Sequence, residues 1–295
     1  MRIVFILFML SGLILFSCNS NPEQAEEHFE SLREHPANDE IKEIIYSMYL
    51  PTDMGDVFSR SGTNYNPELP APIADATLYS TPEQIALMLG VYGVDITYMK
   101  LLGQTAPAAE YYKIIEQLSS KVGVPVSVFE MSSQRLEKYF SNEDSLASVI
   151  EDIYKKTDAF FKESGDEHLA ALSLAGGWIE AMYIGVSIIE ADSTNYVMAE
   201  RILQQKYSLN SIYTLVSNHQ ESLSIKAYLL MLKKLRKIFE EVDIKYQKEG
   251  FSVDTTQKKL QAYRAHIIYD DETMANLITS VKLIRKEFIR VEPDN

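Results

Sequence analysis

Helix start and stop signals follow one another from Ser80 to the end of the chain, separated by only a few residues. Thr81, Pro82 and Glu83 combine a capping hydroxyl, a proline at the first helical position and an acid in the first turn. Connections of about two to five residues make consecutive helices pack antiparallel. We therefore expect an all-α fold, a bundle or array of antiparallel helix hairpins, with no convincing strand.

The positions of caps, prolines and glycines divide the chain into predicted helices of different length. We expect helices over residues 39–50, 82–102, 105–123, 125–140, 144–162, 167–189, 195–206, 209–218, 222–248, 255–269 and 271–290.

The chain opens with one basic residue, Arg2, and then runs apolar from Ile3 to Phe16. Fourteen helical residues span roughly 21 Å, which is too short for the hydrocarbon core of a bilayer. A charged start, a short apolar run and small residues are typical of a secretory signal. The next residues, Leu15 to Cys18, resemble the lipobox of bacterial lipoproteins, which implies a signal peptide over residues 1–17 and lipidation of Cys18.

Cys18 is the single cysteine of the chain, and its thiol is the nucleophile that the resemblance requires. Two or three acyl chains, such as palmitate, hold a protein on a membrane stably. Asn19 stands where an aspartate retains lipoproteins in the inner membrane, so the resemblance favours the outer membrane, on its periplasmic or its surface face. The alternative is an ordinary secretory signal with an incidental cysteine. Residues 18–38 are expected to form a lipidated, acidic tether, and residues 39–295 the helical domain.

Residues 51–80 contain four prolines and two glycines and fit no regular element. A loop of this length is either a functional flap or a strap that packs on the core. We expect an irregular strap, because apolar side chains recur along it: Tyr65, Leu69, Ile73, Leu78 and Tyr79.

Two apolar segments, residues 87–98 and 172–183, match in their order of apolar, small, acidic and tyrosine positions, 85 residues apart. The match places Asp95 opposite Glu180 and Tyr98 opposite Tyr183. It indicates either an internal two-fold duplication or a chance similarity between two buried helices. Small residues in both segments would let helices approach closely: Gly90, Gly93, Ala175, Gly176 and Gly177.

Three short segments, residues 62–67, 89–95 and 175–180, resemble a group of uncharacterised all-helical lipoproteins from Bacteroidota-type bacteria. The likeness spans most of the chain after Cys18. It implies the fold class and an envelope address, and it brings no activity or catalytic residues.

Asp95 and Glu180 each lie in the middle of an apolar segment, with a tyrosine three positions later on the same helical face. A buried carboxylate must be paired, hydrogen-bonded or protonated. If the duplication brings the two acids together, they could perform general acid–base work. The other interpretation, which we favour, is structural: each acid bonds a tyrosine hydroxyl or a helix end. Asp95, Tyr98, Glu180 and Tyr183 are therefore candidates for a ligand site or a structural polar site.

Other chemistry has little support in the sequence. One cysteine excludes a disulfide framework, and the five histidines form no metal-binding motif, so we expect neither metal nor cofactor. The net charge of −14 is unsuited to binding nucleic acid. Basic runs over residues 233–237 and 282–290 are expected to be solvated helix faces, partners of the acidic half or, less favoured, contacts with anionic lipid.

Two functional hypotheses follow. The first is an envelope lipoprotein without catalytic activity, a membrane-tethered helical domain that binds an envelope protein or a small ligand. The second is a hydrolase that acts on envelope glycans through Asp95 and Glu180, with residues 51–80 as a lid.

Overall fold

The computed structural model describes residues 62–74, 76–128, 153, 155–220, 222–247, 252–254, 259–261 and 264–290. The chain divides into two compact units, residues 1–43 and 44–295, and all described residues belong to the second. The predicted signal peptide, the tether with Cys18 and the helix over 39–50 lie outside the described residues. Residues 51–61 of the strap and most of the predicted helices over 125–140 and 144–162 also lie outside them.

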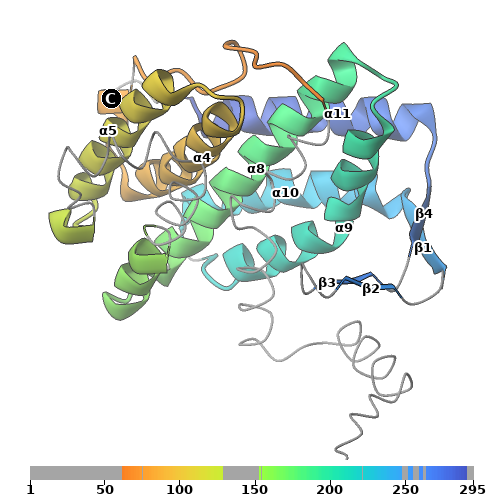
Figure 1. The fold of residues 1–295 in the computed structure, drawn as a ribbon. Coiled ribbons are helices and arrows are strands. Elements are labelled where there is room, and N and C mark those ends of the chain that lie inside the picture. Colours follow the sequence, from red (N-terminus) through yellow and green to blue (C-terminus); the bar gives the residue numbers. More distant parts are fainter. Residues whose placement is uncertain are drawn as a thin grey trace, which may run out of the picture. The chain divides into compact units, whose positions relative to one another are not determined.

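Two helices that are apolar on all sides form the centre of the described unit (Figure 1). They are α4 (Pro82–Leu101) and α8 (Glu167–Ala191). Every residue of α4 from Gln84 to Lys100 is buried. The predicted start of α4 is confirmed, because the Thr81 hydroxyl accepts a hydrogen bond from the Gln84 amide.

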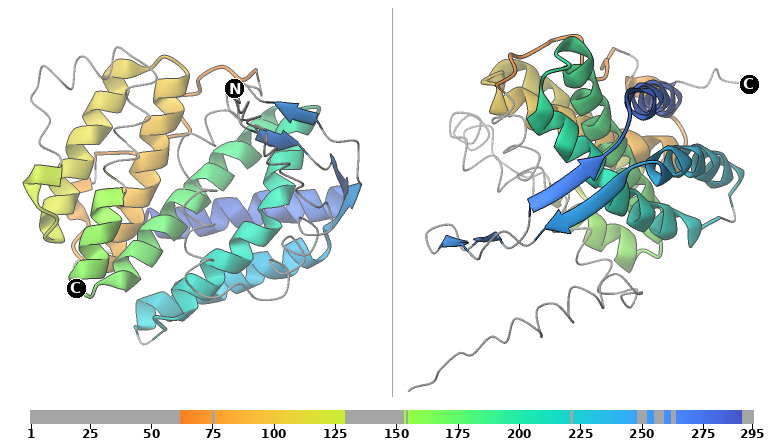
Figure 2. Two further views of the ribbon diagram at one scale, coloured as in Figure 1. Left: turned by 60° about the horizontal axis from the view of Figure 1, so that its bottom comes forward. Right: turned by 90° about the vertical axis from the view of Figure 1, so that its right-hand side faces the viewer.

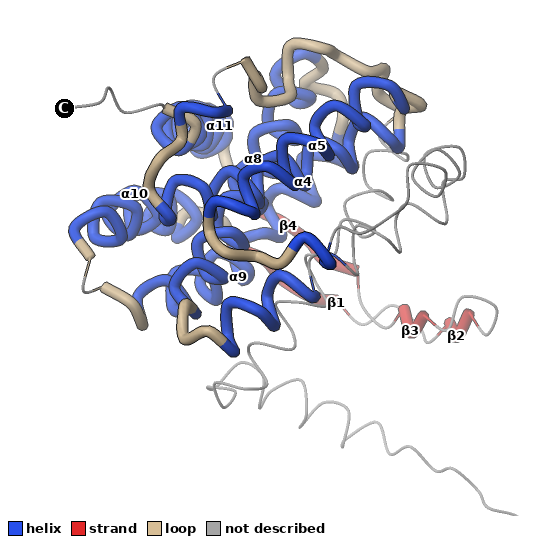
Figure 3. Tube along the Cα trace, turned by 90° about the vertical axis from the view of Figure 1, so that its left-hand side faces the viewer, coloured by secondary structure: helices blue, strands red, loops and turns tan. Residues whose placement is uncertain are grey.

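Four amphipathic helices surround this centre: α5 (Thr105–Lys121), α9 (Tyr196–Ser217), α10 (Leu223–Glu240) and α11 (Asp271–Phe288). Helix α5 packs on α4, α9 on α8, and α10 on α9, while α11 packs on both α8 and α10. Residues 155–163 are also helical. The described residues are mostly helical, as Figure 3 shows, which confirms the predicted bundle or array of helices.

One predicted break is wrong. We expected separate helices over 195–206 and 209–218, but α9 runs unbroken from Tyr196 to Ser217. The buried stripe explains the continuity, because Ile202, Leu209, Ile212 and Val216 recur at helical spacing across the expected break.

The prediction of helix over residues 241–248 and 255–269 is also wrong, since strands occupy the described part of these segments. Strand β1 (Asp243–Gln247) pairs antiparallel with β4 (Arg264–Ile268), and β2 (Ser252–Asp254) pairs with β3 (Lys259–Gln261). Figure 2 shows the longer pair, β1 and β4, at the ends of α10 and α11. Apolar and polar residues alternate along β1, and Ile244 lies opposite Ile267, with both side chains packed on the core. This period of two suits a strand with one buried face.

Helices α4 and α8 approach so closely that a side chain would not fit between them. A Cβ atom placed on Gly90 would lie 1.8 Å from the Ser173 carbonyl oxygen, and one on Gly176 would lie 2.1 Å from the Leu87 carbonyl oxygen. Glycine is therefore required at both positions. These contacts bring the middles of the two apolar helices together.

Residues 62–74 and 76–80 lie across α4 as an irregular strap with one short 3₁₀ turn, η1 (Ala76–Leu78). Of the five apolar side chains noted in the sequence, two are buried and two pack against the core. Only Leu78, 54% exposed, points to solvent. Backbone groups of the strap also bond the buried side chains Asp95 and Arg285.

Candidate functional site

The structure brings Asp95 and Glu180 together. Asp95 lies in the middle of α4 and Glu180 in the middle of α8, and the close crossing of these helices brings their carboxyl groups within reach of a hydrogen bond. Both side chains are 0% exposed. The two acids that occupy matching positions in segments 87–98 and 172–183 thus meet inside the core.

Arg285 of α11 neutralises Glu180. Its Nε donates to Glu180 Oε2 over 2.9 Å and its second guanidinium nitrogen donates to Oε1 over 3.0 Å. The same nitrogen also donates to the Leu69 carbonyl oxygen of the strap over 3.2 Å. The Tyr183 ring lies against the guanidinium, with 4.3 Å between the ring centre and the Arg285 carbon. An arginine that bonds a carboxylate through two nitrogens (bidentate) and stacks on an aromatic ring is a strong and directional partner for a buried carboxylate.

Asp95 and two tyrosines hold the strap by its backbone. The Ala71 amide donates to Asp95 Oδ2 over 2.9 Å, and the Tyr111 hydroxyl donates to the Ala71 carbonyl over 2.7 Å. The Tyr92 hydroxyl donates to the Pro72 carbonyl over 3.0 Å. An irregular segment cannot satisfy its own backbone groups when it is buried, so these side chains take the place of secondary structure.

One proton belongs to the acid pair. No N–H or O–H group of the described residues donates to Asp95 Oδ1. Burial, reinforced by the negative charge of Glu180, raises the pKa of Asp95 well above its usual range. A proton on Oδ1 that points at Glu180 satisfies both oxygens, since Asp95 then donates to Glu180 and accepts from Ala71.

Glu180 is the member of the pair that gives up its proton more readily. Burial, the largest effect, raises its pKa, but the opposite charge of Arg285 and the hydrogen bonds from Arg285 and Asp95 oppose that rise, whereas the pKa of Asp95 is raised well above its usual range. Burial alone would lower the pKa of Arg285, but Glu180 and Asp95 raise it, so the guanidinium stays charged. The cluster therefore contains one ion pair and one neutral acid.

Two carboxyl groups that share a proton are an acid–base pair in principle. In glycoside hydrolases, however, the two carboxyl groups lie about 5 to 9.5 Å apart and leave room for sugar or water between them. Here they bond each other, and Ala71 and Arg285 occupy the remaining positions. In this arrangement the cluster locks three helices to the strap, and acid–base chemistry on a substrate requires the strap to lift.

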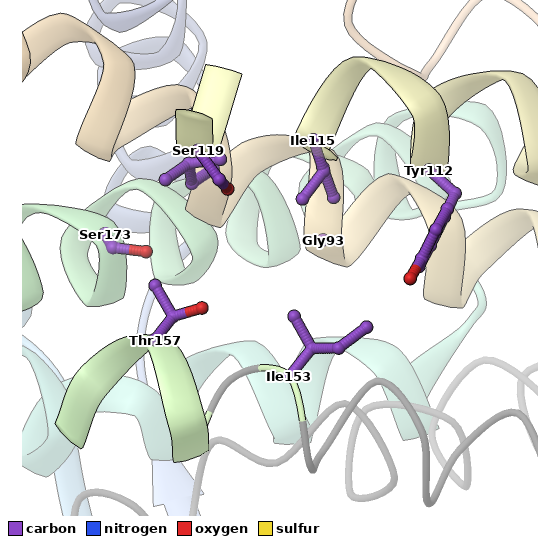
Figure 4. Close-up of a pocket in the computed structure, with 8 residues that line it drawn as sticks. Gly93, Tyr112, Ile115, Ser119, Ile153, Thr157 and Ser173 are labelled. Carbon is purple, nitrogen blue, oxygen red and sulfur yellow. The ribbon is translucent and has the colours of Figure 1, made fainter. Parts of the chain in front are cut away.

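A small cavity lies elsewhere, between α4, α5, α8 and residues 153 and 157 (Figure 4). Its volume is about 30 Å³, enough for one or two water-sized groups. The hydroxyl groups of Ser119, Ser173 and Thr157 lie on one side and the Tyr112 ring on the other. The Ser119 hydroxyl is buried and has no hydrogen-bond partner among the described residues.

This cavity is separate from the acid pair. Gly93 lines it, and Asp95 is two residues further along α4, which places the two positions on nearly opposite sides of the helix. Neither carboxyl group contributes to its wall. The mostly apolar lining suits a small apolar group, while the hydroxyl groups of Ser119, Thr157 and Ser173 are the polar partners that a water molecule would need.

The two tyrosines of the sequence prediction lie in the cluster but in other roles than expected. Among the described residues neither bonds Asp95 or Glu180: the Tyr98 hydroxyl accepts from the Asn66 amide over 2.9 Å, and Tyr183 stacks on Arg285. The duplication stays a prediction. Its paired acids meet, but their surroundings differ, because Asp95 contacts the strap and Glu180 contacts the arginine.

Arg285 is the residue that sequence reasoning did not single out. Its basic run was expected to be a solvated helix face or a partner of the acidic half, and Arg285 is such a partner: it is 8% exposed and pairs with Glu180. The spacing of the sequence does indicate its burial, because Arg285 follows Val281 by four positions and precedes Phe288 by three, on the buried stripe of α11.

The described residues contain no group of three or more His, Cys, Asp or Glu side chains that could hold a metal ion. Within the same residues, α8 is the one helix long and apolar enough to cross a membrane. Its most apolar stretch is 83% buried among the other helices, which suits the core helix of a folded domain.

Comparison of the chain with models of known protein families, with curated proteins and with solved structures finds no match.

Proposed function

We propose that this chain is a lipid-anchored envelope protein whose helical domain binds an envelope partner or a small ligand without catalysis. The anchor is Cys18, and Asn19 favours the outer membrane, on its periplasmic or surface face. A short apolar run that ends at the only cysteine of the chain supports the anchor.

The observation that carries the non-catalytic role is the complete burial of Asp95 and Glu180. Each acid already has a protein partner, Ala71 for Asp95 and Arg285 for Glu180. Groups held in this way stabilise a fold and do not meet a substrate while the strap is closed. The domain then acts through its surface, positioned by the tether.

Metabolic labelling with a palmitate analogue in the native host tests the anchor. We expect label on the wild-type protein and none on Cys18→Ser, with the wild-type protein in the membrane fraction. An equally labelled Cys18→Ser protein would contradict lipidation at this residue, and an unlabelled wild-type protein would contradict lipidation altogether.

Hydrolysis of envelope glycans is the second candidate, and the shared proton of Asp95 and Glu180 favours it. Purified protein is incubated with peptidoglycan, and released sugars are measured beside the unfolding free energy. We expect no turnover, and a change of stability in Asp95→Asn. Turnover that Asp95→Asn abolishes while the variant stays folded would establish the hydrolase and overturn the binding role.

Native mass spectrometry of protein solubilised gently from its own envelope tests the binding role directly. We expect a complex with another envelope protein or with a small molecule. A bare monomer in repeated preparations would contradict it.

A further inference from the structure

Helix α10 exposes a face on which lysines surround two leucines. Leu223 is 82% exposed and Leu230 62% exposed, and they stand seven residues apart, on one side of the helix. The exposed lysines of the same helix are Lys226, Lys233, Lys234 and Lys237. We call these two leucines and four lysines the lysine–leucine face.

The six residues of this face lie close together around the helix. At 100° per residue they fall within an arc of about 100°, over a length of roughly 21 Å. The opposite side of α10 carries the buried residues that fix the helix to the domain, among them Ile225, Leu232 and Phe239. The orientation of the lysine–leucine face is therefore set by the core.

The face is a concentrated positive charge on an acidic chain. From Leu223 to Lys237 the helix has no acidic side chain, and Glu240 and Glu241 follow at its end. No carboxylate of the described residues is salt-bridged to the four lysines. The whole chain carries a net charge of −14, so the sign of the charge on this face is opposite to that of the chain as a whole. Figure 3 shows α10 at one edge of the helical unit.

We propose that the lysine–leucine face docks on a membrane surface that contains anionic phospholipid. Lysines near an anionic surface gain electrostatic attraction, and exposed leucines between them enter the headgroup region. A bilayer is preferred to an acidic protein as the partner because the proposed anchor at Cys18 keeps the domain beside a membrane, and in this the inference rests on the proposed function. Docking would fix which side of the domain faces the membrane.

Binding of the full chain to vesicles tests this proposal, in a Cys18→Ser background that has no acyl chains. Vesicles of phosphatidylcholine alone are compared with vesicles that contain phosphatidylglycerol. One variant replaces Lys226, Lys233, Lys234 and Lys237 by glutamine. The matched control replaces four lysines elsewhere by glutamine, Lys113, Lys162, Lys245 and Lys286. All variants retain the apolar N-terminus, so its own insertion cancels in the comparison.

We expect binding to phosphatidylglycerol vesicles that weakens with salt, and roughly a tenfold or greater loss in the face variant with little change in the control. Leu223→Ser with Leu230→Ser should also weaken binding. Equal binding to both kinds of vesicle, or equal losses in the face variant and the control, would overturn the proposal. So would phosphatidylglycerol binding that survives in the face variant, or a face that captures an acidic protein and no vesicles.

The experiments can refute the lipid anchor at Cys18 and the membrane docking of the lysine–leucine face independently of each other. Vesicle binding here does not use Cys18, so its absence leaves palmitate labelling untouched. Loss of palmitate labelling with vesicle binding intact would remove the anchor and leave the docking surface. Far-ultraviolet circular dichroism and thermal melting confirm that each variant is folded.

Discussion

Asp95→Asn is expected to stabilise the protein at neutral pH, although it changes a fully buried residue. The pKa of Asp95 in the folded protein is raised well above its unfolded value of about 4. The folded state therefore holds a proton that the unfolded chain has released above about pH 4. The contribution of this proton to the free energy of unfolding is fully present below about pH 4. It is lost at about 1.4 kcal/mol per pH unit as the pH rises toward the pKa of Asp95 in the folded protein.

An asparagine reproduces the protonated acid. Its oxygen accepts from the Ala71 amide and its NH₂ group donates to Glu180, but it has no proton to lose. At pH 4 the variant should therefore match the wild type. The difference in unfolding free energy should then grow in favour of Asp95→Asn, by no more than about 1.4 kcal/mol per pH unit, and level off above the folded pKa.

Urea unfolding from pH 4.5 to pH 7.5 measures this difference. Trp178 is the only tryptophan and is buried in α8, so its fluorescence reports the loss of the core. Asp192→Asn is the control, because hydrogen bonds from Thr194 lower the pKa of Asp192, and its contribution is lost only as pH falls below about 4. A difference between Asp95→Asn and wild type that is constant across this range would refute the shared proton.

The remaining predictions concern the ion pair and the helix crossing, and urea unfolding measures each. Arg285→Met should cost about 3 to 5 kcal/mol, because Glu180 is left charged, buried and unpaired. Lys282→Met, which breaks an exposed ion pair, should cost less than about 1 kcal/mol, and equal losses would contradict the role of burial. Gly90→Ala should cost about 3 kcal/mol, because its methyl group meets the backbone of α8. Gly185→Ala, whose methyl group meets the end of a movable side chain, should stay within about 1 kcal/mol of wild type; a similar cost at both glycines would show that the crossing can relax.

Helix ends were predictable where one residue carries the signal. Thr81 caps α4 and Asp270 caps α11, each through its own side chain, and both starts are confirmed. Predictions failed where neighbours in space decide. The segment after Glu240 was extended as helix, but Lys206 of α9 binds the Val242 carbonyl, and Ile244 packs beside Ile267 in a strand pair.

The sequence predicts half of the candidate site. Asp95 and Glu180 are evident in the sequence, since an acid within an apolar helix needs a partner. Their contact was foreseen only as a consequence of the duplication, which stays a prediction. The partners themselves, Arg285 and the backbone of Ala71, come from segments 105 residues after Glu180 and 24 residues before Asp95.

The sequence by itself determined most of the helical segments among the described residues, which of them are apolar on all sides, and which buried groups need compensation. These properties depend on neighbours within one or two helical turns, which a linear pattern records. Only the tertiary structure decided which atoms compensate them, that an irregular strap covers the acid pair, and that four lysines and two leucines of α10 stay uncovered. Those outcomes depend on how the helices pack: glycines allow α4 and α8 to touch, and this contact sets what each remaining side chain can reach.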